Sequence, residues 1–287
     1  MADSPIITHV SDTARWVAVY RAMETDRPDA IFKDPFARRL AGERGAAIAK
    51  AMDKRSRADW PMIVRTAVMD EIILRAVRED GITQVVNLAC GLDARPWRMP
   101  LPASLHWVDV DHAVMLDLKQ TELANERTAC EYEGVRLDLA DDMARRALFA
   151  RLAADGRRTL VISEGLLVYL DDAHVATLAR DLAATRGFEL WLIDLASPGL
   201  IKMMRRAWGS QVDKGNAPFK FAPPEHTAYF APLGWAEREW RPMMDEAFRL
   251  NRTFPFARLF RFMGKLASKR KQEEFKRFSG VGLLART

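Results

Sequence analysis

Apolar residues change their spacing along this chain near Gly81. Before Gly81 they recur at helical spacing, and this pattern predicts helices that begin near Ser11, at Asp34-Pro35 and at Pro61. After Gly81, short apolar runs alternate with helical stretches, as in the repeated βα units of a parallel sheet. The sequence therefore predicts a Rossmann-like α/β fold with an N-terminal helical extension.

Short apolar runs are the predicted strands of this sheet. They cover residues 83–89, 106–110, 135–137, 160–163, 188–195 and 279–285. Helices are predicted between the first five of them, over residues 112–125, 141–154 and 171–185. Between residues 197 and 250, aromatic residues and prolines are mixed without a regular period. We expect this stretch to be an inserted helical cap without regular strands.

The domain organisation follows from the absence of a linker or repeat in the pattern. No stretch rich in Gly, Ser or Pro divides the 287 residues, so we expect one domain. Its expected parts are N-terminal helices over 1–80, a ligand-binding core over 81–196, the cap over 197–250, and a C-terminal helix with a final strand over 251–287.

Positive charge is concentrated late in the chain, between Arg252 and Arg277, while the whole sequence carries a net charge of +5. Apolar residues interleave with these charges at helical spacing. They are Phe254, Phe256, Leu259, Phe260, Phe262, Met263 and Leu266. This pattern favours a helix that packs its apolar side on the protein and exposes its charged side. The alternative is a nucleic-acid-binding surface, whose affinity would fall steeply with salt.

Several classes of protein are disfavoured by the composition. The apolar runs are far shorter than the roughly 20 residues of a membrane span, and the N-terminus does not resemble a secretory signal. We therefore expect a soluble cytoplasmic protein without a membrane partner. Cys90 and Cys130 are expected to be free thiols, and the scattered histidines predict no metal site.

The first predicted strand runs into a turn of small residues, Val85 to Asp93. In open α/β sheets this turn is where a nucleotide-like ligand approaches the backbone. Gly91 is a glycine as expected, but Ala89 stands where another glycine is usual. The turn by itself therefore leaves a ligand site and an ordinary loop equally open.

Carboxylates follow the next predicted strands at the same edge of the sheet. Asp109 and Asp111 lie about twenty residues beyond the turn, a spacing that suits the hydroxyls of a ribose. Asp138, followed by Leu139, suits an adenine, and Glu164 suits an amino group. The alternative for Asp109 and Asp111 is that they are solvated acids of a loop, and the alternative for Glu164 is that it caps a helix. A pyrophosphate would need a Gly-x-Gly-x-x-Gly turn, so the pattern favours S-adenosylmethionine over a dinucleotide.

Together these stretches resemble the leucine carboxyl methyltransferase family, which includes bacterial S-adenosylmethionine-dependent methyltransferases and O-methyltransferases of polyketide pathways. The resemblance extends from Ser11 to Leu195. It is carried by Ser11-Asp12-Thr13-Ala14 with Arg21-Ala22, Phe32-Lys33-Asp34-Pro35, Cys90-Gly91-Leu92-Asp93-Ala94-Arg95, Asp109-Val110-Asp111 and Glu164-Gly165-Leu166-Leu167-Val168-Tyr169.

The resemblance implies that six residues bind S-adenosylmethionine. They are Arg65 for the methionine carboxylate, Gly91 against the methionine moiety, Asp111 for the ribose, Asp138 and Leu139 for the adenine, and Glu164 for the amino group. The chain departs from the family pattern at Asn87, Ala89 and Ala113, which stand in place of an acid, a glycine and a proline. These departures bear on cofactor affinity.

The expected reaction is methyl transfer to a carboxylate or hydroxyl oxygen of a small molecule, in natural-product biosynthesis. A carboxylate is ionised at neutral pH, whereas a hydroxyl needs a general base. The base candidates are Tyr169, His174, His226 and Tyr229, and the residues chosen as catalytic are Tyr169 and Arg21. The N-terminal helices and the aromatic residues of the cap, namely Trp208, Phe221, Tyr229 and Trp235, are expected to enclose the acceptor.

Two other functions remain open. The chain could methylate the C-terminal carboxylate of a protein, or it could bind S-adenosylmethionine as a non-catalytic partner of other proteins. The oligomeric state is not indicated by the sequence.

Overall fold

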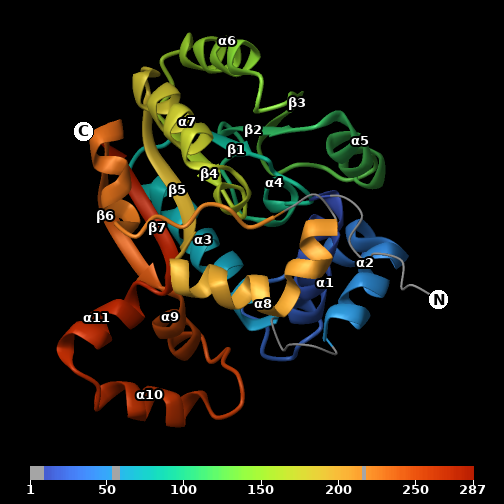
Figure 1. Ribbon diagram of the computed structural model, residues 1–287. Helices are drawn as coiled ribbons and strands as arrows, with labels where there is room; N and C mark the ends of the chain where they lie inside the picture. Colours follow the sequence, from blue (N-terminus) through green and yellow to red (C-terminus); the bar gives the residue numbers. More distant parts are fainter. Residues whose placement is uncertain (1–9, 54–58, 215–217) are drawn as a thin grey trace.

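A computed structural model describes residues 10–53, 59–214 and 218–287. Its centre is a seven-stranded sheet with the strand order β3-β2-β1-β4-β5-β7-β6 (Figure 1). The strands are β1 (Gln84–Leu88), β2 (His106–Asp111), β3 (Glu131–Arg136), β4 (Thr159–Ser163), β5 (Phe188–Ala196), β6 (Trp235–Pro242) and β7 (Ser279–Arg286). β1 to β5 are parallel, and β7 is antiparallel to both β5 and β6. This confirms the predicted Rossmann-like fold class.

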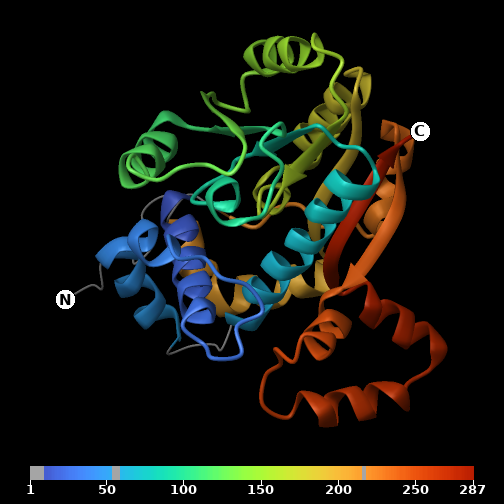
Figure 2. The same cartoon turned by 180° about the vertical axis from the view of Figure 1, so that it is seen from behind.

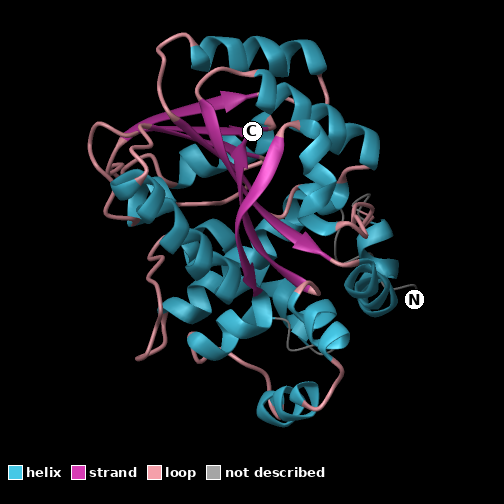
Figure 3. Ribbon diagram, turned by 90° about the vertical axis from the view of Figure 1, so that its left-hand side faces the viewer, coloured by secondary structure: helices cyan, strands magenta, loops and turns pink. Residues whose placement is uncertain are grey.

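Helices cover both faces of the sheet (Figure 3). They are α1 (Val10–Thr25), α2 (Ala37–Asp53), α3 (Asp59–Glu79), α4 (Arg95–Arg98), α5 (Ala113–Glu122), α6 (Asp142–Ala153), α7 (Asp172–Ala184), α8 (Pro198–Lys214), α9 (Met243–Arg249), α10 (Ala257–Lys265) and α11 (Lys269–Lys276). The 3-10 helices are η1 (Leu167–Tyr169) and η2 (His226–Leu233). One core packs α6, α7 and η2 on the sheet, and a second packs α3 and α9 on its other face.

The central strands are buried on both faces, which explains why they read as continuous apolar runs. Every residue of β1 and β4 is buried, with Val86 in one core and Val85 in the other. These strands agree with the prediction within one or two residues. The edge strand β3 begins at Glu131, four residues before the predicted start at 135, because its side chains are largely half-buried and carry little apolar signal.

The region between residues 197 and 250 is not the strand-free cap that the sequence suggested. It contains α8 and η2, but residues 235–242 form β6 and complete the sheet. Glu237 and Arg238 are exposed on this outer strand, so its sequence lacks an apolar run. In the N-terminal region, α1 includes Ser11, near which the first helix was predicted to begin.

The C-terminal region forms two short helices where one was predicted. α10 and α11 stand apart from the sheet at the lower edge of the molecule, as Figure 2 shows from behind. Four of the predicted apolar residues do not pack on the protein: Phe256, Leu259, Phe262 and Leu266 are 77%, 56%, 62% and 74% exposed. Phe254 does pack, because its ring centroid lies 5.9 Å from that of Trp60 on α3. The expected packing of this apolar side is therefore wrong for the four exposed residues. The side chains of Phe260 and Met263 lie outside the described set.

Candidate functional site

The carboxyl ends of β1, β2, β4 and β5 border a cavity of about 2050 Å³. Its lining comes from α1, α3, the turn after β1, the loops after β2, β3 and β4, and the C-terminal helices α10 and α11. Pockets for small ligands usually measure roughly 300–1,000 Å³. The cavity therefore has room for a cofactor and a second molecule.

The turn after β1 has a left-handed backbone at two positions. Gly91 has φ of +51°, and its amide donates to Asp111 Oδ2 over 2.7 Å. A Cβ on Gly91 would lie 3.2 Å from the Cβ of Ala14 on α1. Gly91 is thus needed both for its backbone conformation and for the close approach of α1. Asn87 is buried, and its side-chain amide donates to Asp93 Oδ2, so this hydrogen bond joins the end of β1 to the turn.

Ala89, where the family pattern has a glycine, also has a left-handed backbone, with φ of +53°. This conformation destabilises the folded state by roughly 1–2 kcal/mol when the residue has a Cβ. A glycine avoids this cost, but its greater conformational freedom in the unfolded chain offsets part of the benefit. We expect Ala89→Gly to raise the free energy of unfolding by about 1 kcal/mol, measured by urea unfolding. Ala150→Gly, at an exposed helical position, should lower it by about 1 kcal/mol. Equal destabilisation by both changes would contradict the strain at Ala89.

The two acids at the end of β2 have different surroundings. Asp111 borders the cavity, and its Oδ1 accepts the amide of His112 over 2.7 Å. Asp109 is fully buried and pairs with Lys119 Nζ at 2.7 Å. Burial by itself would lower the pKa of Lys119, but the Asp109 carboxylate outweighs it and holds that pKa well above its usual value. Asp109 is therefore a structural ion pair beneath the turn, and Asp111 is the acid available to a ligand.

Glu164, after β4, lies between two guanidinium groups. Arg65 Nε on α3 is 2.9 Å from Glu164 Oε1, and Arg95 Nη1 is 2.7 Å from Glu164 Oε2. Burial would raise the pKa of Glu164, but Arg95 and Arg65 outweigh it and lower the pKa to about 2. Glu164 is therefore a carboxylate throughout the physiological range, suited to accept hydrogen bonds from a cation and unsuited to donate a proton.

Residues that the sequence analysis did not select complete this cluster. Arg65 Nη1 also pairs with Asp194 Oδ2 at 2.9 Å, and Asp194 Oδ1 accepts the amide of Gly165 at 2.7 Å. Arg95 is buried and pairs further with Asp70 and Asp93. Asp194 breaks the apolar run of β5 near its carboxyl end, and this was the available signal for it.

Asp138 and Leu139 follow β3 and border the same cavity. Asp138 is exposed, and its Oδ1 accepts the amide of Ala140 over 2.9 Å. Leu139 is half-buried against the core on the α7 face. The polar and apolar pair is therefore placed beside the cavity, within the same lining as Asp111.

The two residues chosen as catalytic both border the cavity. Tyr169 in η1 stacks on Phe219, with ring centroids 5.7 Å apart, and burial raises its pKa above the usual value. Arg21 on α1 has its Nε 2.9 Å from Asp34 Oδ2 and donates through Nη2 to the carbonyl of Leu92 over 2.6 Å. These contacts tie α1 to the turn after β1, so the observed contacts of Arg21 are structural.

Most of the expected acceptor residues of the cap lie elsewhere. Phe221 and Trp235 are buried in the core on the α7 face, where Trp235 Nε1 donates to the carbonyl of Ala179. Tyr229 and His226 are absent from the cavity lining as well, and the side chain of Trp208 lies outside the described set. Other aromatic and sulfur-containing residues border the cavity: Trp16, Trp60, Met62, Met203, Met204, Phe219, Met244, Phe254 and Phe275.

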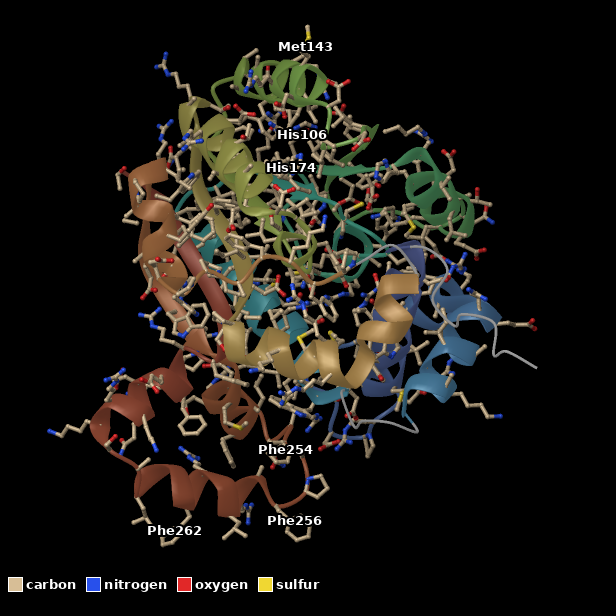
Figure 4. The ribbon with its side chains drawn as sticks, viewed as in Figure 1. His106, Met143, His174, Phe254, Phe256 and Phe262 are labelled. Carbon is tan, nitrogen blue, oxygen red and sulfur yellow. The ribbon has the colours of Figure 1, made fainter. Side chains whose placement is uncertain are left out.

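His174 lines the cavity with a side chain that is 57% exposed, and its Nδ1 lies 2.7 Å from Oδ1 of Asp171, the N-cap residue of α7. Of the four base candidates, therefore, His174 and Tyr169 lie at the cavity. Figure 4 shows His174 on α7, well separated from Phe254. Among the described residues no group of three His, Cys, Asp or Glu side chains is arranged to hold a metal ion.

His226 instead packs edge-on against Trp240, with ring centroids 4.2 Å apart. Burial, followed by the nearby Arg277, lowers its pKa to about 4. The unfolded chain therefore binds a proton below about pH 6.5 that the folded chain does not bind until about pH 4. We expect folding stability to fall as the pH drops from 6.5 to 4, and His226→Asn to flatten this part of the profile. Urea unfolding midpoints at several pH values measure it, and parallel profiles would contradict it.

Comparisons with known proteins agree with this geometry. A family model described as leucine carboxyl methyltransferase matches residues 14–183. A Streptomyces avermitilis protein, provisionally named an S-adenosyl-L-methionine-dependent methyltransferase, is 32% identical over 241 residues, which cover 78% of this chain and 82% of the relative. A Frankia alni protein with the same provisional name is 35% identical over 205 residues, covering 67% of this chain and 71% of the relative.

Solved structures share the fold. A DUF574 family protein from Streptomyces avermitilis superposes with a TM-score of 0.62 at 12% identity, covering 99% of both chains. A Thermobifida fusca protein, provisionally titled a methyltransferase, gives a TM-score of 0.61 at 14% identity, covering 98% of this chain and 96% of the other. The chain belongs to the leucine carboxyl methyltransferase family of S-adenosylmethionine-dependent methyltransferases.

Proposed function

We propose that this methyltransferase transfers the methyl group of S-adenosylmethionine to a carboxylate oxygen of a small, largely apolar acid. The observation that carries the proposal is that one cavity is lined both by Asp111, Glu164 and Arg65 and by several aromatic and methionine side chains. A polar cofactor and an apolar acceptor can therefore lie in the same cavity.

The chemistry of the lining fits S-adenosylmethionine. In our proposal Glu164 accepts hydrogen bonds from the amino group of the methionine moiety, and Arg65 binds its carboxylate. Asp111 accepts the ribose hydroxyls. Both Asp111 oxygens already accept backbone amides, but a carboxylate has about four acceptor positions and can take further donors.

The adenine end would be held by the pair that follows β3. Asp138 would accept the adenine amino group, and Leu139 would cover the ring. Gly91 would let the methionine moiety approach the backbone of the turn, since no side chain stands there. No phosphate-binding group is required for this ligand.

When bound, the sulfonium of the cofactor supplies an already activated methyl group. The protein then has to orient the acceptor oxygen and exclude water. A carboxylic acid is ionised near neutral pH and needs no base. Burial disfavours the phenolate of Tyr169, and the His174 side chain is exposed and already paired with Asp171, so neither residue is well placed to deprotonate a hydroxyl acceptor. This favours a carboxylate acceptor over a hydroxyl.

The experiment is a titration of the protein with S-adenosylmethionine by calorimetry, followed by methyl transfer to matched pairs of aromatic and aliphatic carboxylic acids and phenols. Micromolar cofactor binding and methyl ester formation are expected, and Tyr169→Phe should keep the turnover of an acid acceptor. Methylation of phenols that Tyr169→Phe abolishes would replace the carboxylate by a hydroxyl acceptor. No cofactor binding by the folded protein would overturn the site.

Two other functions give distinct results in the same assay. Methylation of peptides that end in a free carboxylate, without turnover of small acids, would indicate a protein acceptor. Cofactor binding without transfer to any acceptor in the set would indicate a non-catalytic binding protein. A role in natural-product biosynthesis remains a prediction.

A further inference from the structure

The two C-terminal helices expose an apolar face that the enzyme site does not use. We call residues 256–276 the C-terminal arm; they comprise Phe256, α10, α11 and the residues that join the two helices. Leu259 and Phe262 lie three residues apart on α10 and share a side of that helix, while Phe256 and Leu266 are exposed just before and just after it. Figure 4 shows Phe256 and Phe262 pointing away from the rest of the molecule.

The arm also carries exposed cations. They are Arg258, Arg261, Lys269, Arg270 and Lys271. The acids of the arm, Glu273 and Glu274, are already engaged by Lys276 and Arg270 at 2.8 and 3.0 Å. The arm therefore presents aromatic and aliphatic side chains flanked by net positive charge.

This combination is typical of a helix that lies in the headgroup region of an anionic bilayer. A second copy of the chain fits it less well, because a twofold contact through the same face would bring the same cations together. Nucleic acid fits it less well because Leu259 and Leu266 offer no ring on which a base can stack.

The arm is also continuous with the active-site cavity. Arg261, Gly264, Ala267, Lys271 and Phe275 belong to the cavity lining. The arm remains attached to the body, since Arg261 lies over the ring of Phe248 on α9 at 4.4 Å. A surface that covered the arm would therefore face the rim of the cavity.

We propose that the C-terminal arm docks the protein on an anionic lipid surface, with Phe256, Leu259, Phe262 and Leu266 inserted among the lipids. This revises the expectation of no membrane partner. It does not require a membrane span, and none of the helices in the described residues is long and apolar enough to form one. The docking is independent of the acceptor proposed above.

The test is co-sedimentation of the full chain with vesicles of phosphatidylcholine, with or without about one quarter phosphatidylglycerol. Binding to the anionic vesicles is expected to exceed binding to neutral ones and to weaken with salt. Phe256→Ser/Phe262→Ser should weaken it at least ~10-fold. Met23→Ser/Met143→Ser removes exposed apolar side chains on α1 and α6 and should leave binding unchanged. Calorimetry with S-adenosylmethionine verifies that each variant is folded.

Four results would overturn the proposal. The first is no binding of the wild-type chain to anionic vesicles at low salt. The second is equal loss of binding in the two double variants. The third is a dimer in analytical ultracentrifugation that Phe256→Ser/Phe262→Ser dissociates, because this assigns the arm to a second copy of the chain. The fourth is an oligonucleotide complex that anionic vesicles do not displace, because this assigns the arm to nucleic acid.

Discussion

Asp111→Asn is expected to weaken the binding of S-adenosylmethionine about 100-fold. Asp111 is the acid of β2 that borders the cavity, whereas Asp109 is fully buried under it. A hydrogen bond to a charged group contributes about 1.5–3 kcal/mol, and two ribose hydroxyls would share this carboxylate. A total loss of about 3 kcal/mol corresponds to roughly two orders of magnitude in affinity. Calorimetric titration of the two proteins measures the change.

The variant also has a structural effect that has to be separated from binding. Asp111 accepts hydrogen bonds from the backbone amides of Gly91 and His112. The side-chain amide nitrogen of the new asparagine cannot accept a hydrogen bond, so whichever backbone amide it faces would lose its partner. The thermal midpoint of the variant should therefore be compared with its affinity. Asp117→Asn, at an exposed acid on α5, is the matched control and should bind normally. An Asp111→Asn protein that is folded and binds like wild type would remove Asp111 from the site.

Lys119→Met is expected to lower the free energy of unfolding by about 3–5 kcal/mol, because it leaves the carboxylate of Asp109 buried without its partner. The Nζ of Lys119 is 2.7 Å from Asp109, and neither side chain is exposed to solvent. Trp107 Nε1 also donates to Asp109 but does not neutralise its charge. This loss is a large part of the roughly 5–15 kcal/mol by which folded proteins are usually stable. Urea unfolding measures it.

Two further variants distinguish the unpaired charge from loss of packing. Asp109→Asn/Lys119→Met removes both charges and should regain much of the stability. Arg136→Met breaks an exposed pair with Asp117 and should cost less than about 1 kcal/mol. If Lys119→Met and Arg136→Met destabilise the protein equally, the Asp109–Lys119 pair is not the structural element proposed here.

The central strands and the acids that follow them were predictable from the sequence. β1 and β4 are covered on both faces, so most of their residues are apolar and their positions follow from the apolar run. Carboxyl ends of parallel strands meet at one edge, which is why Asp111 and Glu164 were expected near one another. Both border the same cavity.

Strands and helices at the margin were not predictable to the same degree. β6 is an edge strand with exposed charged residues, and its partner β7 lies about forty residues further along the chain. On α10 the apolar spacing correctly indicated a helix, but the spacing of residues does not state what lies opposite them. The sequence was read as core where the structure exposes Phe256 and Phe262.

By itself, the sequence determined the fold class, the edge of the sheet that borders the cavity and the family, because these depend on local periodicity and on short motifs at strand ends. The tertiary structure decided which acid meets the cavity. Asp109 and Asp111 are two residues apart on β2 and share a face, so the sequence pattern predicts the same role for both. In the structure Lys119 on α5 pairs with Asp109, which distinguishes its role from that of Asp111. The tertiary structure also paired Arg95 with Glu164, linked Asp194 to Glu164 through Arg65, and placed Trp235 in the core, because such contacts join residues far apart in sequence.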